Sequence, residues 1–300
     1  MFARLLVPLD GSRMAEASLP IAAYLGRRLK CPLTLLHVIE RDAPGKVHGE
    51  RHLANVDEAE AYLRQVAATQ LPHDLQVEFH VHSAEVKHVA RSIADHGAEL
   101  RPALIVMCTH GRGAVREWIF GSIAQQVAST GRTPTLFVRP RAATSGEFSL
   151  TCLAVPLDGN RVHENALPTA VELAQACQAS LHLVSVVPTP ATLAGPTAAA
   201  GRLLPAATRA LLEADQAGAA AYIESVRTRL TAEGLQATAE CLRGEPAAMI
   251  IEAAERSHAD LIVFGTHGTI GTEAFWARSV PPNVAGHTWI PILLVPVRED

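Results

Sequence analysis

The chain has 300 residues and a formal charge of −4, with 48% hydrophobic but only 4% aromatic residues. This charge gives no general attraction to nucleic acid or to an anionic membrane. No apolar run reaches the ~18 residues of a membrane span. The length suits about two domains, and cores made mostly of Val, Leu, Ile and Ala favour packed α/β layers.

The N-terminus and the cysteines both indicate a cytoplasmic protein. The opening stretch MFARLLVPLDGS is interrupted by Pro8 and Asp10 and is too short to serve as a signal peptide. The five cysteines are odd in number, show no CxxC spacing and lie in apolar surroundings. We therefore expect reduced, buried thiols rather than disulfides.

An internal repeat organises the chain. The stretch from Leu5 to Glu40 returns between Leu153 and Pro188, with LLVPLDGS matched by LAVPLDGN. Later, ALIVMCTHG is matched by DLIVFGTHG, and TPTLFVRP by IPILLVPV. Because order, spacing and chemistry all repeat, we predict two domains of one fold, at 1–141 and 150–300, joined by a short polar linker.

Taken in chain order, each half reads as strands alternating with helices. The apolar runs RLLVPL, LTLLHVI, ALIVMC and TLFVRP lack alternation, as expected for strands buried on both faces. Between them, 14–30, 56–71 and, in the second half, 208–234 are predicted helices. The pattern predicts α/β domains that are doubly wound, each with a five-stranded, mostly parallel sheet and helices on both faces.

Ligands of such sheets bind at the carboxyl ends of the strands, near the switch point in strand order. Asp10 and Asp158 follow the first strand of each half, and Val38 and Val186 end the second strand. The loop CTHGRGAVREWIFGS leads into an apolar-periodic helical stretch, where Gly121 and Ser122 suit a helix start. Free N–H groups there would hold phosphate, although a strand, a glycine loop and a helix also occur as a simple tight turn.

These features together resemble a tandem universal stress protein, with two domains of that family covering nearly all of the chain. The family's fold is Rossmann-like and similar to the adenine-nucleotide α-hydrolases, and its ATP-binding members carry Gly-x2-Gly-x9-Gly-(Ser/Thr) after the fourth strand. In the first half, Cys108-x2-Gly111-x9-Gly121-Ser122 keeps this spacing with Cys in place of the first Gly. Cysteine is small, so we expect a mild effect.

The resemblance implies an ATP site, with or without Mg²⁺, in a stress-response binding module. The residues implied in the first half are Pro8, Asp10, Val38, Met107, Cys108, Gly111, Gly121, Ser122 and Ile123. Their weaker counterparts in the second half are Pro156, Asp158, Val186, Gly265, Gly268, Arg278 and Ser279.

The second site departs from the family pattern at its helix start. Arg278 replaces the third Gly, and Pro281 and Pro282 follow where backbone N–H groups are needed. Either this site is degenerate, with Arg278 filling the pocket beside a carboxylate such as Asp158, or Arg278 supplies a cation to a phosphate.

The chain carries no recognisable catalytic set: it has neither a GxSxG elbow nor a Walker Lys-Ser/Thr, so efficient catalysis is not expected. An adenylating enzyme of the wider fold class would need a glycine-rich loop after the first strand, which PLDGSRMAE lacks. The remaining alternative is a non-nucleotide scaffold of the same fold. In the family, domains pair through their last strands, so the two halves would pair within the chain, and a homodimer of whole chains is also compatible.

Histidines raise the question of a metal site. His80 and His82 alternate on a predicted strand and face one side, with His88 some residues later. A metal site needs a third or fourth converging ligand, and the sequence reveals no complete set. We therefore predict no metal and interpret these side chains as solvent-facing histidines at an edge of the sheet.

Overall fold

A computed structural model gives the fold of the chain. It describes residues 2–41, 45–47, 50–100, 103–109, 121–130, 132–140, 148–159, 164–193, 198, 199, 201, 203–266 and 279–296.

The first half alternates strands and helices as predicted. Its strands are β1 (Arg4–Pro8), β2 (Leu33–Glu40), the short β3 (Lys46–Val47) and β4 (Glu50–Arg51), β5 (Val77–Val86), β6 (Ala103–Cys108) and β7 (Thr135–Val138). Its helices are α1 (Arg13–Glu16), α2 (Leu19–Leu29), α3 (Val56–Gln70), α4 (Val89–Glu99) and α5 (Ser122–Thr130).

The second half repeats this order. Its strands are β8 (Cys152–Pro156), β9 (Ser180–Val187), β10 (Ala237–Arg243), β11 (Leu261–Thr266) and β12 (Ile292–Pro296). Its helices are α6 (Ala166–Cys177), α8 (Pro205–Ala232), α9 (Pro246–Arg256) and α11 (Val280–His287).

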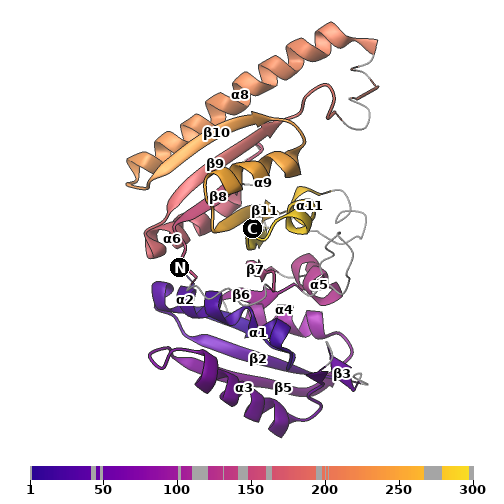
Figure 1. Cartoon of the computed structure of the whole chain (residues 1–300), viewed down its shortest axis with the longest axis vertical. Helices are drawn as coiled ribbons and strands as arrows, with labels where there is room; N and C mark the ends of the chain where they lie inside the picture. The colour runs from indigo at the N-terminus through magenta and orange to yellow at the C-terminus, as the bar shows by residue number, and fades with distance from the viewer. Residues whose placement is uncertain are drawn as a thin grey trace.

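A single ten-stranded sheet runs through both halves, in the order β10-β9-β8-β11-β12-β7-β6-β1-β2-β5 (Figure 1). Neighbouring strands within each half are parallel, which confirms the predicted doubly wound α/β fold. The strand order reverses between β1 and β6, and again between β8 and β11. These two switch points are where the fold leaves a crevice for a ligand.

The two halves join through their last strands. β7 and β12 pair antiparallel, with Leu293 opposite Leu136 at the centre of the register. Just beyond the strands, Arg139 donates from Nη1 to the carbonyl oxygen of Thr288 at 3.1 Å, and its guanidinium lies 3.6 Å from the centre of the Trp289 ring. The predicted pairing of the halves within one chain is therefore confirmed.

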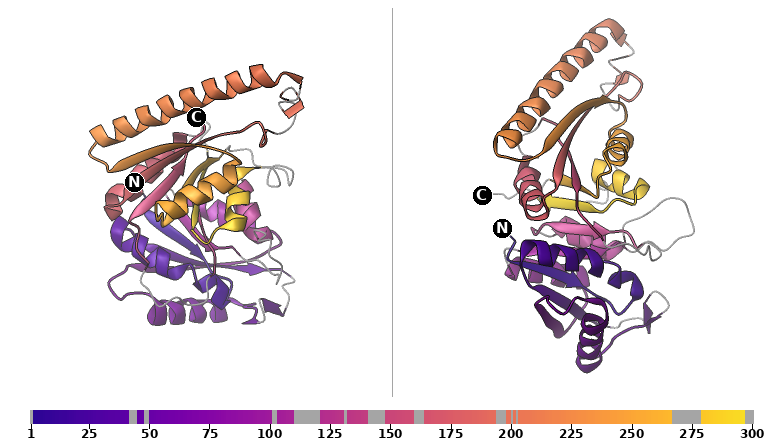
Figure 2. Two further views of the ribbon diagram at one scale, coloured as in Figure 1. Left: turned by 45° about the horizontal axis from the view of Figure 1, so that its top comes forward. Right: turned by 60° about the vertical axis from the view of Figure 1, so that its left-hand side comes forward.

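Two layers of helices cover the sheet (Figure 2). Side chains of α2, α3, α6 and α8 pack against one face in a single apolar cluster that spans both halves. Those of α4, α5, α9 and α11 pack against the other face in a second cluster. Because strands buried on both faces carry apolar side chains in both directions, the unbroken apolar runs of the sequence are explained.

The helix predicted over 14–30 is wrong in its continuity. The chain forms α1, turns at Ala17 and Ser18, and restarts as α2, with Pro20 in its first turn. Proline lacks the N–H that a continuous helix needs and favours the first turn of a new one. The predicted helices over 56–71 and 208–234 are confirmed as α3 and α8 within three residues at each end.

All five cysteines are unpaired, and four of them are buried, as expected for small apolar side chains. Among the helices that the described residues form, none combines the length and apolar character needed to span a bilayer.

Candidate functional site

The turn after β1 holds an aspartate at the first switch point. Gly11 adopts a φ of 90°, a left-handed conformation that glycine reaches without strain. This bend lets the Asp10 Oδ1 accept a hydrogen bond from the Ser12 N–H at 2.9 Å. Ser12 in turn caps α1 by accepting from the Ala15 N–H. In the second half, Gly159 follows Asp158 with a φ of 82°, so both turns are built the same way.

A buried histidine of β2 contacts the backbone of the turn after β1. His37 is 2% exposed, and its Nδ1 lies 2.8 Å from the carbonyl oxygen of Leu9, which precedes Asp10. Its Nε2 lies 3.4 Å from the Leu53 carbonyl oxygen. Burial lowers the pKa of His37 despite these two acceptors. The His37 imidazole therefore links the turn to β2.

A cavity of about 330 Å³ opens at the second switch point. Five residues expected from the sequence line it: Pro156, Asp158, Val186, Gly265 and Ser279. The other lining residues are mostly apolar and comprise Leu157, Val184, Pro246, Ile250, Phe264, Thr266, Val280 and Pro281. A mainly apolar cavity with a few polar groups at one end, at the lower end of the usual range of ligand-site volumes, suits a small organic ligand.

The start of α11 forms one wall of this cavity. Ser279 is the N-cap, and its buried Oγ has no hydrogen-bond partner among the described residues. Pro281 and Pro282 are the second and third residues of the helix, after Val280, so two positions of its first turn carry no N–H. The helix nonetheless continues to His287, as expected for proline in a first turn.

The start of α5 is the matching feature of the first half. The Gly121 carbonyl oxygen accepts from the Gln125 N–H at 3.0 Å, so Gly121 caps the helix and Ser122 is its first residue. Glycine is among the residues that are favoured at the N-terminal cap of a helix. The adjacent Ile123 is 40% exposed.

Cys108 ends β6 on the opposite face of the sheet from α5. Its side chain is 1% exposed and belongs to the cluster that contains α2, whereas its neighbour Met107 faces the cluster that contains α5. Burial, and secondarily the charge of Asp10, raise the pKa of the Cys108 thiol to about 12. The thiol therefore lies buried near Asp10.

Comparison with known proteins identifies the repeat. The sequence model of the Universal stress protein family matches residues 1–139 and again 153–296. The chain belongs to the universal stress protein family. It therefore contains two universal stress domains in tandem, as the repeat predicts.

Among related proteins, Universal stress protein MJ0531 of Methanocaldococcus jannaschii is 29% identical over 151 residues, which is 50% of this chain and 85% of that protein. Universal stress protein Sll1654 of Synechocystis is 31% identical over 144 residues, which is 46% of this chain and 86% of that protein. Each of these relatives thus matches about half of the chain, consistent with a tandem arrangement.

Solved structures resemble the whole chain. A putative universal stress protein from Pseudomonas aeruginosa has a TM-score of 0.66 at 15% identity, covering 98% of this chain and 93% of that one. A universal stress protein from Archaeoglobus fulgidus has a TM-score of 0.63 at 18% identity, covering 98% of this chain and 96% of that one. At these identities the likeness concerns the fold of the tandem universal stress protein.

Three residues of the expected sites, Gly111, Gly268 and Arg278, lie outside the described residues. Other residues that line the cavity, such as Val184, Ile250 and Phe264, were not predicted from the sequence. Ile250 lies one turn into the helix that opens with Gly244-x-Pro246, and Phe264 is the counterpart of Met107. Ile250 could have been predicted, because it is an apolar residue one turn after a helix start that Pro246 marks in the sequence.

Proposed function

We propose that this universal stress protein binds ATP in its N-terminal half and acts as a nucleotide-responsive regulatory module in stress response, without efficient ATP hydrolysis. The observation that carries the proposal is the start of α5 at the first switch point. Gly121, Ser122, Ile123 and Ala124 all carry backbone N–H groups, and the first four N–H groups of a helix have no intrahelical acceptor.

Such a helix start is suited to phosphate, because its free N–H groups and the helix dipole both favour an anion. The apolar part of the ligand would lie against Pro8, Val38 and Met107. These residues are the counterparts of Pro156, Val186 and Phe264, which line the cavity of the second half. Asp10, held by Ser12, supplies a carboxylate for the ribose hydroxyls. Mg²⁺ would arrive with the triphosphate, because it keeps most of its ligands from water and phosphate oxygens.

The second half supports a weaker variant of the same site. Its cavity keeps Asp158 and apolar walls, but Pro281 and Pro282 remove two phosphate donors. We propose that this half accepts the nucleoside part of a ligand and discriminates poorly for its phosphates.

The test is calorimetric titration of ATP into the full chain, with Mg²⁺ present. We expect one ATP per chain at the tight site, and loss of that site in Gly121→Val, whose added side chain blocks the close approach of phosphate. Gly218→Val is the matched control, because Gly218 is exposed in α8 and a side chain there meets no neighbour within 4 Å.

Val186→Phe, which fills the cavity of the second half, separates the two sites. Tight binding that survives Gly121→Val and disappears in Val186→Phe would move the ATP site to the C-terminal half. No uptake of ATP by the wild-type chain would overturn nucleotide binding. It would favour the scaffold function instead, for which the continuous sheet through β7 and β12 is the supporting feature.

A further inference from the structure

Three histidines of the first half converge beside the edge of the sheet. His80 and His82 lie on one face of β5, the last strand of the sheet, and His96 reaches them from α4. One ring nitrogen from each lies within 4.8 Å of the other two. The Nε2 atoms of His80 and His96 are 2.9 Å apart. The alternation of His80 and His82 is visible in the sequence, whereas His96 lies 14 residues after His82 and is brought to them only by the fold.

The hydrogen bonds of the cluster establish its proton arrangement. His96 is 9% exposed, and its Nδ1 lies 2.7 Å from the carbonyl oxygen of Ser92, which can only accept. Nδ1 therefore carries the proton, and the lone pair of Nε2 points at His80. Burial, together with His96 and His82, lowers the pKa of His80. An imidazole nitrogen with a lone pair directed in this way is a metal ligand.

We propose that His80, His82 and His96 bind a divalent transition-metal ion of the class that prefers imidazole ligands, such as Zn²⁺. The ion would replace the proton shared between His80 and His96, and that proton would move to Nδ1 of His80. The Ser92 carbonyl already supplies the outer hydrogen bond that orients a metal-binding histidine. Zn–N bonds of about 2.0–2.1 Å place tetrahedral ligand atoms about 3.4 Å apart. The His80 and His96 nitrogens, now 2.9 Å apart, would separate by about 0.5 Å, and pairs as far apart as 4.8 Å would close by at most about 1.4 Å.

A carboxylate lies near the cluster on the same helix. Glu99 lies three residues after His96, so the two side chains share one face of α4. Both line a cavity of about 390 Å³, together with His82. The charges around this cavity are balanced, with Lys87 and Arg91 offset by Asp95 and Glu99, and Arg91 lies 3.9 Å from Asp95. A dication there faces no net positive charge.

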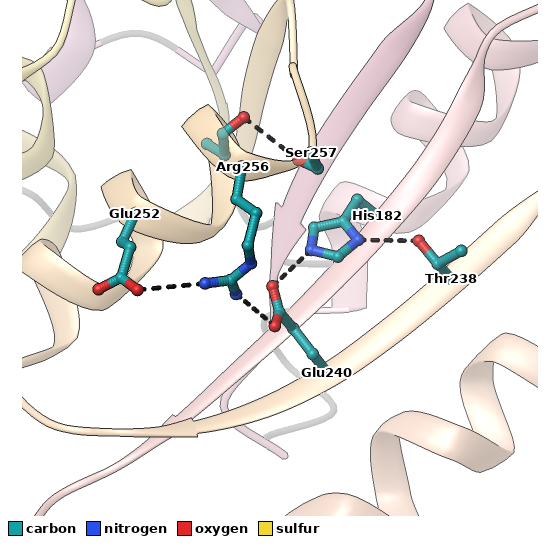
Figure 3. A network of polar contacts seen from close by, with 7 residues as sticks. His182, Thr238, Glu240, Glu252, Arg256 and Ser257 are labelled. Carbon is teal, nitrogen blue, oxygen red and sulfur yellow. Dashed lines mark hydrogen bonds and ion pairs between the residues drawn. The ribbon is translucent and has the colours of Figure 1, made fainter.

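In the second half, the position equivalent to His80 belongs to a structural network of ion pairs. Glu240 takes the place of His80, because the two pair with equivalent residues of the neighbouring strand. Glu240 binds His182 at 2.7 Å and Arg256 at 2.5 Å, and Arg256 also pairs with Glu252 (Figure 3). In this network, Glu240, Arg256 and Glu252 each have a partner for their charge. Among the residues that the structure describes, no carboxylate hydrogen-bonds to the histidine cluster, and its imidazoles face one another.

The test is competition calorimetry of Zn²⁺ against a chelator, using the full chain after removal of metal. We expect one tight site in the wild type, and a loss of at least about tenfold in affinity for His80→Gln and for His82→Gln, since even an outer partner of a metal ligand contributes about 10–100-fold. His73→Gln, at an exposed position of the same half, is the matched control and should bind as the wild type does.

Co²⁺ provides an independent readout. A three-histidine site gives visible d–d bands without thiolate-to-metal charge transfer, and these bands should disappear in His80→Gln. Equal Zn²⁺ affinity in the wild type and in both variants would overturn the proposal, as would charge-transfer bands that assign the ion to a cysteine. Because the ligands are distinct from the ATP contacts proposed above, loss of ATP binding in Gly121→Val leaves this result unaffected.

Discussion

The phosphate-binding role of α5 can be tested by giving it the proline that the second half already has. Ala124 of α5 corresponds to Pro281 of α11. The helix α11 forms even though Pro281 lies in its first turn. Ala124→Pro therefore removes one N–H from the proposed phosphate site while keeping a residue that the fold accepts at the equivalent place.

The size of the effect follows from the bond removed. A hydrogen bond to a charged group contributes about 1.5–3 kcal/mol, which corresponds to roughly a 10- to 150-fold loss of ATP affinity. Adenosine carries no phosphate, so its affinity should change by less than about twofold. The stability of the helix should change little, because the N–H of a first-turn residue has no acceptor within its own helix.

The assay is calorimetric titration of ATP and of adenosine into the wild type, Ala124→Pro and Ala124→Val. Ala124 is 2% exposed, so the added atoms of proline also crowd the core. Ala124→Val adds similar bulk but keeps the N–H, and it isolates that contribution. Wild-type ATP affinity in Ala124→Pro, or an equal loss in Ala124→Val, would refute the assignment of phosphate to this helix start.

Two further predictions concern titratable groups. Folding lowers the pKa values of His37 and His80. The unfolded chain, with histidine pKa values near 6.5, therefore binds protons more readily than the folded chain. The free energy of unfolding should be highest above about pH 6.5 and fall as the pH is lowered to about 5.5. Urea unfolding of the metal-free protein at several pH values measures this, and a free energy that stays constant or rises would contradict it. The pKa of about 12 for Cys108 predicts that its thiol reacts with a thiol reagent far more slowly than that of the less buried Cys241 in the native protein, which mass spectrometry of the labelled chain can follow. Because the Cys108 side chain faces away from α5, Cys108→Gly should change the affinity for ATP less than about twofold, and a larger change would show that this side chain takes part in the site.

The repeat and the alternation of strands and helices could be predicted because they depend on local patterns. The two LDG turns, the four unbroken apolar runs of each half and the matched CTHG and GTHG loops are all visible along the chain. A parallel sheet with alternating helices then has few possible topologies. The pairing of β7 with β12 was expected from the resemblance to the family, whose domains pair through their last strands.

Other features were missed, because they depend on where a helix starts or on residues distant in the chain. The break between α1 and α2 comes from Pro20, whose tolerance in a helix depends on where the first turn begins. The direction of the Cys108 side chain depends on the pleat of β6 between two helix layers, which its small size alone does not reveal. The walls of the second cavity come from both α9 and the sheet, so no single motif contains them.

The histidine cluster shows most clearly which features the sequence determines and which depend on the tertiary structure. The sequence by itself determined that His80 and His82 share one face of a strand, because side chains alternate with a period of two. Only the tertiary structure decided that α4 crosses that face and brings His96 to within 2.9 Å of His80. In the same way, the chain order alone determined where the glycines and prolines of the two helix starts lie. Only the packing of α11 against the end of β11 closed a cavity around Ser279 and Gly265, because a ligand site is made by the spacing between elements and not by the residues of any one of them.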